Sequence, residues 1–228
     1  GQQFGYIYDG FFTEEDAANY ASLRGKEGGI PDHGEGFTPL AGDVKYKDLN
    51  GDHKIDNNDV SAIGNPIYPL LTGNLSMGFS WKGLDFSMTW AGAFKTSRLV
   101  ADFYRYPFGS TNNRSLLKYM IDDAWTPEKG NSAKAPAISL TNSKPNNYKD
   151  SDLWLRDASY VRLKNLEIGY SFPQGMLSKI HLSSLRISLS GYNLLTFDSL
   201  GFSDPESNPS GDTYPLVKVI NFGLKIGF

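Results

Sequence analysis

The chain has 228 residues, among them 24 glycines, 13 tyrosines, 14 phenylalanines and 4 tryptophans, with no cysteine and a formal net charge of −3. The lack of cysteine excludes disulfides and thiolate metal sites, and the weak charge gives no electrostatic reason to expect a nucleic acid partner. No run of about eighteen apolar residues occurs, which excludes a membrane helix but not the alternating strands of a membrane β-barrel.

The first 24 residues predict one short strand and one short helix. "GQQFGYIYDGFF" places Phe4, Tyr6 and Tyr8 on one parity, as a strand with an aromatic face does. "TEEDAANYASLR", residues 13–24, begins with a threonine followed by three acidic residues, which is a common start of a helix. We expect this helix to pack within a long loop.

"DLNGDHKIDNND", residues 48–59, has the spacing of an EF-hand-like calcium loop. Calcium takes roughly six to eight oxygen ligands, which suits oxygen-bearing side chains at alternating positions. His53 stands where a glycine normally allows the sharp turn, and the residue at the twelfth position is an aspartate instead of the longer glutamate. The loop therefore predicts either a structural calcium site or an ion-free polar turn. The candidate ligands are Asp48, Asn50, Asp52, the carbonyl group of Lys54, Asp56 and Asp59.

Long alternating segments begin at residue 71. Residues 71–81 and 84–94 alternate large apolar side chains with small or polar ones, and Lys82-Gly83 between them predicts a hairpin. The same alternation recurs at 160–172, 183–195 and 216–228, although Arg162 and Lys164 break it by sharing the parity of Leu166 and Ile168. Arms of about ten residues are longer than typical soluble strands and match the length that a tilted strand needs to cross a bilayer.

The connections between these segments alternate between short and long. Lys82-Gly83 and residues 173–182 are short, whereas residues 13–68, 95–158 and 196–215 are long. This alternation is typical of outer-membrane barrels, which have short turns on one rim and long extracellular loops on the other. We therefore predict an all-β fold: an antiparallel transmembrane β-barrel segment of about six strands, with short helices in the long loops. The apolar side chains of each strand would face lipid, and the small or polar side chains would face a water-filled lumen.

The remaining motifs give no sign of catalysis. Residues 113–125 predict a second short helix, and three aromatic residues of the long loop either stack on sugar rings or hold the loop together. The three histidines are scattered, and we interpret them as surface residues. No nucleophile elbow, phosphate loop, HExxH motif or pair of catalytic carboxylates occurs, so the chain is not expected to be an enzyme. The aromatic residues are Trp125, Tyr148 and Trp154, and the histidines are His33, His53 and His181.

A series of motifs resembles the SusC/RagA-type TonB-dependent outer-membrane transporters. The series is "YDGFF", "GDVKYKDLNGDHKIDNNDVSAIGNP", "GNLSMGFSWKGLDFSMTWAGAF", "SDLWLRDASYVRLKNLEIGYSFP", "LRISLSGYNLLTF", "GFSDPES" and a final strand that closes on Phe228. The resemblance implies a barrel of roughly 22 strands in the bacterial outer membrane, paired with a SusD-like surface lipoprotein and importing oligosaccharides or peptides with energy relayed by TonB. A plug, a TonB box and the first barrel strands have no counterpart, so residues 1–228 are expected to be the C-terminal portion of such a barrel.

Two other functions stay open at this point. A soluble calcium-dependent carbohydrate-binding β-domain would bury the apolar parity of its strands against a second sheet instead of lipid. A siderophore receptor is the alternative within the transport class. The residues themselves do not name a cargo.

Overall fold

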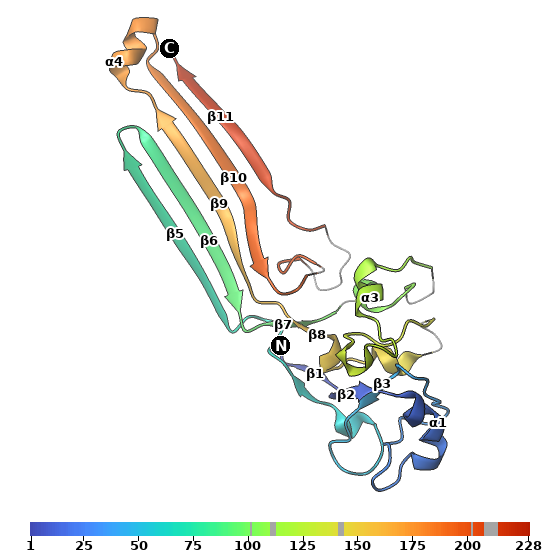
Figure 1. Cartoon of the computed structure of the whole chain (residues 1–228). Helices are drawn as coiled ribbons and strands as arrows, with labels where there is room; N and C mark the ends of the chain where they lie inside the picture. The colour runs from blue at the N-terminus through green and yellow to red at the C-terminus, as the bar shows by residue number, and fades with distance from the viewer. Residues whose placement is uncertain (101, 110–112, 141–143, 202, 208–213) are drawn as a thin grey trace. The chain divides into compact units, whose positions relative to one another are not determined.

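A computed structural model of the chain describes residues 1–100, 102–109, 113–140, 144–201, 203–207 and 214–228. These residues fall into two compact units, which we name the sheet unit and the loop unit (Figure 1). The described residues of the sheet unit are 68–96, 157–201, 203–207 and 214–228. Those of the loop unit are 1–67, 97–100, 102–109, 113–140 and 144–156.

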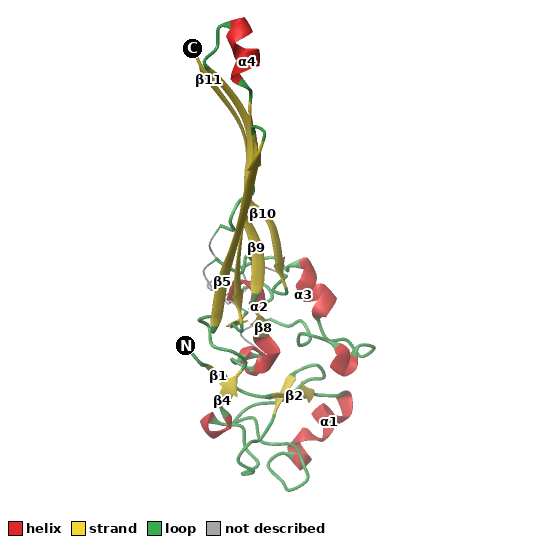
Figure 2. Ribbon diagram, turned by 90° about the vertical axis from the view of Figure 1, so that its left-hand side faces the viewer, coloured by secondary structure: helices red, strands yellow, loops and turns green. Residues whose placement is uncertain are grey.

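The sheet unit is built on one five-stranded sheet. Its strand order is β11-β10-β9-β6-β5, and every pair of neighbours is antiparallel. Figure 2 shows these strands nearly edge-on, as a single twisted layer. The five long alternating segments of the sequence are therefore confirmed as strands that pair with one another. They are β5 (Leu71–Trp81), β6 (Leu84–Phe94), β9 (Tyr160–Ser171), β10 (Ser184–Asp198) and β11 (Val219–Gly227).

The hairpin between β5 and β6 has the predicted two-residue turn. Lys82 and Gly83 both have positive φ angles, 49° and 87°, as a type I′ turn requires. The strands stay in register along their whole length, from Trp81 opposite Leu84 to Leu71 opposite Phe94.

Two β-bulges at one level of the sheet explain the irregular parity of residues 160–172. Lys164 is an extra residue of β9 relative to β6, because the register shifts between Thr89 opposite Asn165 and Trp90 opposite Leu163. β10 has a matching irregularity between Tyr192 and Leu195. Beyond the bulge, Arg162 therefore lies on the face opposite to Leu166, although the sequence parity groups the two together.

The short connection between β9 and β10 is folded into helical turns. It contains α4 (Gln174–Leu177) and the 3₁₀ turn η6 (Ser178–Ile180), and His181 follows with a φ of 57°. Leu177 is buried. Among the residues that the structure describes, no helix is long and apolar enough to span a membrane.

The loop unit contains three two-stranded sheets, and the opening segment belongs to two of them. The prediction of one strand in residues 1–12 is wrong, because Tyr6 and Ile7 separate two short strands and neither joins the five-stranded sheet. The described residues of the sheet unit thus form five strands where about six were expected. The pairs are β1 (Gln3–Gly5) with β4 (Ser61–Ile63), β2 (Tyr8–Phe11) with β3 (Val44–Tyr46), and β7 (Ser97–Leu99) with β8 (Leu155–Asp157).

Short helices occur in the long segments, as predicted. Thr13 caps the first helix, and its hydroxyl accepts from the Asp16 amide at 3.0 Å while the Asp16 carboxylate accepts from the Thr13 amide. The helix predicted at 113–125 is shorter than expected, because Leu117 has an extended backbone and offers no capping side chain. The helices are α1 (Glu14–Leu23), α2 (Asp102–Arg105), α3 (Lys118–Asp123), and the 3₁₀ turns η1 (Asn57–Asp59), η2 (Gly130–Ser132), η4 (Pro145–Tyr148) and η5 (Asp152–Trp154).

Two neighbouring asparagines complete the edge of β3 in the core of the loop unit. The Asn147 side-chain oxygen accepts from the Val44 amide at 2.9 Å, and the Asn146 side-chain amide donates to the Val44 carbonyl at 2.9 Å. Both asparagines are buried, so these contacts satisfy backbone groups that would otherwise lack a partner. The core cluster beside them consists of Phe11, Val44, Tyr46, Ile55 and Ala133.

Candidate functional site

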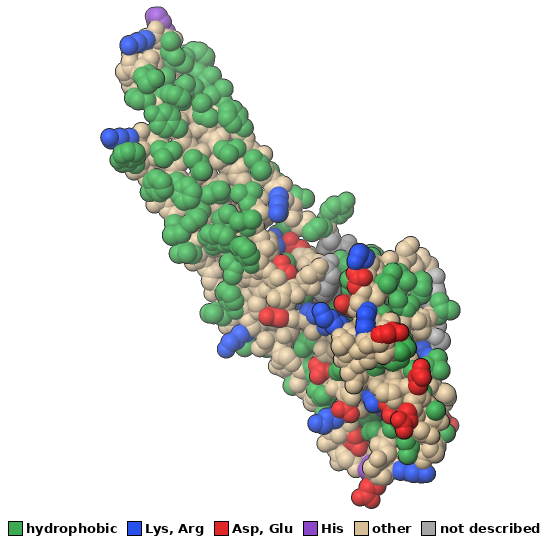
Figure 3. Space-filling model, in the orientation of Figure 1, with side chains coloured by type: hydrophobic (Ala, Val, Ile, Leu, Met, Phe, Trp, Pro, Cys, Tyr) green, Lys and Arg blue, Asp and Glu red, His purple; other side chains and the backbone are tan. Residues whose placement is uncertain are grey.

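One face of the five-stranded sheet is apolar and exposed. Cross-strand pairing aligns one apolar residue from each strand in a row, and comparable rows lie on either side of it. Figure 3 shows hydrophobic side chains gathered over these strands. Exposed apolar patches of this extent normally mark a contact surface. The row consists of Phe79 (56% exposed), Phe86, Ile168 (43%), Leu189 (52%) and Phe222 (70%).

The opposite face of the sheet is polar and lined by small side chains. The row one residue away on each strand contains two serines, a glycine, an acid and an amide. In the described residues of the sheet unit, no second layer of strands covers either face, unlike the sandwich expected of a soluble β-domain. This polar row consists of Gly78, Ser87, Glu167, Ser190 and Asn221.

A first charged group on the polar face joins three strands. Arg186 of β10 contacts both carboxylate oxygens of Asp85 on β6, one of them at 2.7 Å, and Glu167 of β9 at 2.8 Å. Its guanidinium crosses β9 above Gly169, where an added Cβ would overlap it. The glycine therefore opens the path between the arginine and its partner two strands away.

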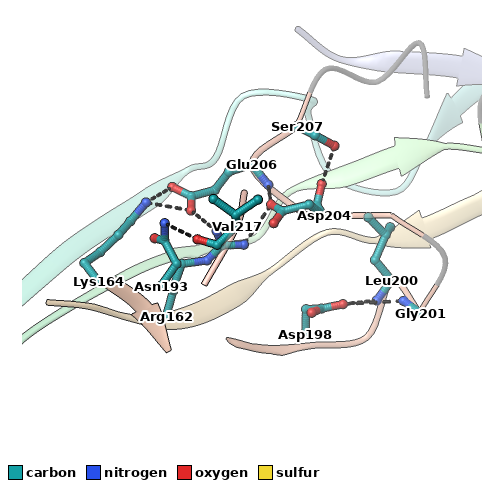
Figure 4. Close-up of polar contacts among 10 residues, drawn as sticks. All are labelled: Arg162, Lys164, Asn193, Asp198, Leu200, Gly201, Asp204, Glu206, Ser207 and Val217. Carbon is teal, nitrogen blue, oxygen red and sulfur yellow. Dashed lines mark hydrogen bonds and ion pairs between the residues drawn. The ribbon is translucent and has the colours of Figure 1, made fainter. Parts of the chain in front are cut away.

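A second charged group holds a loop segment on the same sheet (Figure 4). We name residues 199–201 and 203–207 the strap. Arg162 donates to Asp204 at 2.7 Å and pairs with Glu206 at 3.1 Å, while Lys164 contacts both oxygens of Glu206 at 2.6 Å. The Arg162 side chain is 1% exposed, so its charge is compensated by the two strap acids instead of by solvent.

The calcium-loop candidate is closed by its own hydrogen bonds. Asp48 accepts from the amides of Gly51 and His53, both at 2.7 Å, and Asp52 accepts from the Lys54 amide at 2.9 Å. His53 adopts a φ of 62°, so it takes the left-handed conformation usually given to glycine at this position. The histidine in place of glycine therefore does not prevent the sharp turn.

The second half of the calcium-loop candidate is anchored in the core. Asp59 is fully buried and accepts from the amides of Leu49 and Asp56, each at 2.8 Å. Ile55 belongs to the core cluster. Within the part of the chain that the structure describes, no three acidic or histidine side chains meet where they could hold a metal. The Asn50 side chain bonds to Asp52, and calcium binding stays a prediction.

The aromatic side chains of the long loop serve mainly as packing. Tyr148 and Trp154 are 3% and 4% exposed, their rings stack at 5.9 Å, and the Trp154 indole donates to the Asn147 carbonyl at 2.9 Å. Trp125 is partly buried and lies against Gly42, where a Cβ would overlap its ring. The burial of Tyr148 and Trp154 favours the interpretation that they hold the loop together.

His33 is a structural residue that the sequence interpretation missed. It is 5% exposed, so its assignment to the surface is wrong. Its Nε2 accepts from the Tyr46 amide at 3.2 Å, which leaves the proton on Nδ1 to donate to the Pro31 carbonyl at 2.9 Å. Burial lowers the pKa of His33 to about 4. No motif marks this histidine, because its ring contacts come from Phe12, Phe37 and Tyr46.

The comparisons with known proteins point to one group. No protein-family model matches the chain. TonB-dependent receptor P3 of Formosa agariphila is 27% identical over 252 residues, which cover 100% of this chain and 22% of the receptor. TonB-dependent receptor P26 of the same organism is 27% identical over 83% of this chain and 20% of the receptor. The chain thus spans about a fifth of the length of these relatives.

Solved structures of the RagAB peptide importer are similar in fold. The open-open state matches with a TM-score of 0.64 and 20% identity, covering 100% of this chain and 22% of that one. The closed-closed state matches with a TM-score of 0.62 and 19% identity, covering 100% and 23%. At this identity the likeness describes the fold.

Proposed function

Since this chain is a homologue of TonB-dependent receptors, we propose that its sheet unit forms part of the wall of an outer-membrane transport barrel. The observation that carries the proposal is the single-layered sheet with an exposed apolar face and a small polar face. Lipid would solvate the apolar rows, and the polar rows would line the passage. The relatives are receptors and the structural neighbours importers, so the function is transport and not catalysis.

Within the transport class we place the chain in the SusC/RagA type. The motif series supports this assignment, and so does the fold likeness to a peptide importer. Peptides are the first cargo class to test and oligosaccharides the second, with a SusD-like lipoprotein as the surface partner and TonB as the energy source. Residues 1–228 would be the C-terminal portion of the barrel, with the loop unit on the extracellular side.

We also propose a structural calcium ion in residues 48–59. The alternating oxygen-bearing side chains, the left-handed His53 and the anchoring of Ile55 in the core support it. Asp52 and Asp56 are the exposed acidic candidates and Asp48 is half-buried, while Asp48 and Asp59 each already accept from two amides. The ion would stiffen the loop and take no part in chemistry.

Fractionation of cells that produce the full-length protein tests the proposal. The protein is expected in the outer-membrane pellet after ultracentrifugation, to be released by detergent and not by high salt. Recovery in the supernatant without detergent would favour the soluble carbohydrate-binding domain. A strain that lacks the protein should lose uptake of a labelled peptide or oligosaccharide mixture and regain it with the full-length gene. Uptake of iron-siderophore alone would favour the siderophore receptor.

A further inference from the structure

Two basic side chains of β9 pair with the acids of the strap, and the amides of Leu200 and Gly201 donate to the Asp198 carboxylate at the end of β10 at 2.9 and 3.4 Å. The strap has no helix or strand, and its described internal bonds are local: the Ser207 amide donates to the Asp204 carbonyl at 3.0 Å, and the Glu206 amide donates to the Asp204 carboxylate at 2.8 Å. The ion pairs that join it to β9 run through Arg162 and Lys164. Leu200 and Pro205 are its buried apolar residues.

The sheet departs from regular pairing at the level where the strap is held. Lys164 bulges out of the register between β9 and β6, which turns Arg162 toward the polar face. On the neighbouring strand, Asn193 has a φ of 52° and its side chain donates to the Val217 carbonyl at 3.3 Å. Without the bulge, the guanidinium of Arg162 would point to the apolar face, where a charge has no partner.

The charge on Arg162 has two satisfactory environments. With the strap in place, Asp204 and Glu206 compensate it. If the strap were displaced, Arg162 would lie on the uncovered polar face, where water would hydrate its guanidinium. Moving the strap from the attached to the displaced position would exchange the ion pairs of Arg162 for hydration of its guanidinium. Because one interaction replaces the other, the free-energy difference between the two positions would be small enough for the strap to move.

We propose that Arg162 is the positioning residue of a charge latch that holds the strap on the polar face and narrows the passage along it. This inference rests on the proposed function, in which that face lines the passage. Arg162 binds the strap through both acids, and Lys164 supports it through Glu206 alone. Removal of the latch charges is expected to free the strap while the sheet stays intact.

Hydrogen–deuterium exchange of the purified full-length protein in detergent tests the latch. In Arg162→Met, the amides of Glu206 and Ser207 should exchange at least about tenfold faster, because their acceptors belong to a strap that opens locally. Arg186→Met is the matched control: it also removes an arginine that pairs with two acids on the polar face, but away from the strap. The control should leave strap exchange unchanged.

Asp204→Asn combined with Glu206→Gln gives the same test from the strap side, should Arg162→Met fail to fold. Unchanged strap exchange in this double variant would overturn the latch, and so would an equal rise in Arg186→Met.

Uptake supplies a second measurement: the double variant should raise the rate of uptake of long cargo relative to short cargo. Faster exchange with an unchanged cargo ratio would contradict the narrowing of the passage. Absence of the protein from the outer membrane would instead refute the proposed function.

Discussion

Arg186 reaches across strand β9 to Asp85, two strands away, over the bare Cα of Gly169. One side chain thereby joins β10 to β6, and its contact with Glu167 adds β9. A glycine inside a strand usually weakens it, but here it makes room for a bidentate ion pair. The polar face is therefore cross-linked by side chains as well as by the backbone ladder.

Gly169→Ala is expected to displace the Arg186 guanidinium from Asp85, because the new Cβ overlaps it, and to lower the urea concentration at the midpoint of unfolding slightly. Urea unfolding of the full-length protein in lipid vesicles measures the change. Gly73→Ala is the control, since a Cβ at Gly73 of β5 meets nothing within 4 Å. Equal effects of the two substitutions would contradict the idea that the space above Gly169 is needed for the contact between Arg186 and Asp85.

Phe222→Lys and Asn221→Lys place the same charge on opposite faces of β11. A lysine that faces lipid costs about 2–4 kcal/mol near the middle of a bilayer, whereas a lysine in a wet lumen costs little. We expect Phe222→Lys to lower the amount of folded protein in the outer membrane and Asn221→Lys to leave it near the parental level. Immunoblots of unheated and heated membrane samples report the folded fraction. A larger loss for Asn221→Lys would reverse the assignment of the faces.

Acidification should weaken the loop unit through His33. Its pKa in the folded state, about 4, lies below the ordinary value of 6.5, so the unfolded state binds the proton more readily. The stability from the neutral ring is complete above pH 6.5 and is lost as the pH falls toward 4. The loss is at most about 3.5 kcal/mol, given about 1.4 kcal/mol per pKa unit.

Hydrogen exchange of the Tyr46 amide between pH 7 and 4.5, corrected for intrinsic rates, measures this loss, because that amide donates to the His33 ring. His33→Asn should flatten the pH dependence. A pH dependence that is the same in the variant would assign the effect to other groups.

Calcium is expected to stabilise the loop unit if residues 48–59 bind it. A calcium concentration a hundredfold above the dissociation constant would add about 2.7 kcal/mol to the stability of the loop. Protease resistance of the loop unit, compared in calcium and in chelator, provides the measurement. Asp52→Asn should abolish the calcium effect, whereas Asp9→Asn, an exposed acid outside the motif, should retain it. Equal resistance in calcium and chelator would support the ion-free turn.

The strands could be predicted from the sequence because their signal is local. The hairpin at Lys82-Gly83 follows from period-two alternation and from a turn that needs two positive φ angles. The face on which Arg162 lies could not be predicted this way, since a bulge is a property of two paired strands and not of one.

The candidate sites were less predictable because their partners are distant in sequence. The Asn146-Asn147 pair is buried against residues about 100 positions away, and His33 is buried by rings from several separate elements, which no local pattern reveals. The motif at 48–59 was visible from spacing alone, but the hydrogen bonds that engage Asp59 depend on the fold. The helix expected at 113–125 was too long because the apolar pattern includes Leu116 and Leu117, whereas the helix begins only at Lys118, after the extended backbone of Leu117.

The bulge at Lys164 inserts one residue into β9 and so reverses which face of the sheet the residues before it occupy. Every side chain on one side of it is assigned to the opposite surface from the one that simple counting gives. Deletion of this one residue would turn Arg162 outward and leave Asp204 and Glu206 without their arginine. Relatives compared by residue number alone would therefore match outward-facing positions to inward-facing ones, unless the extra residue is aligned first.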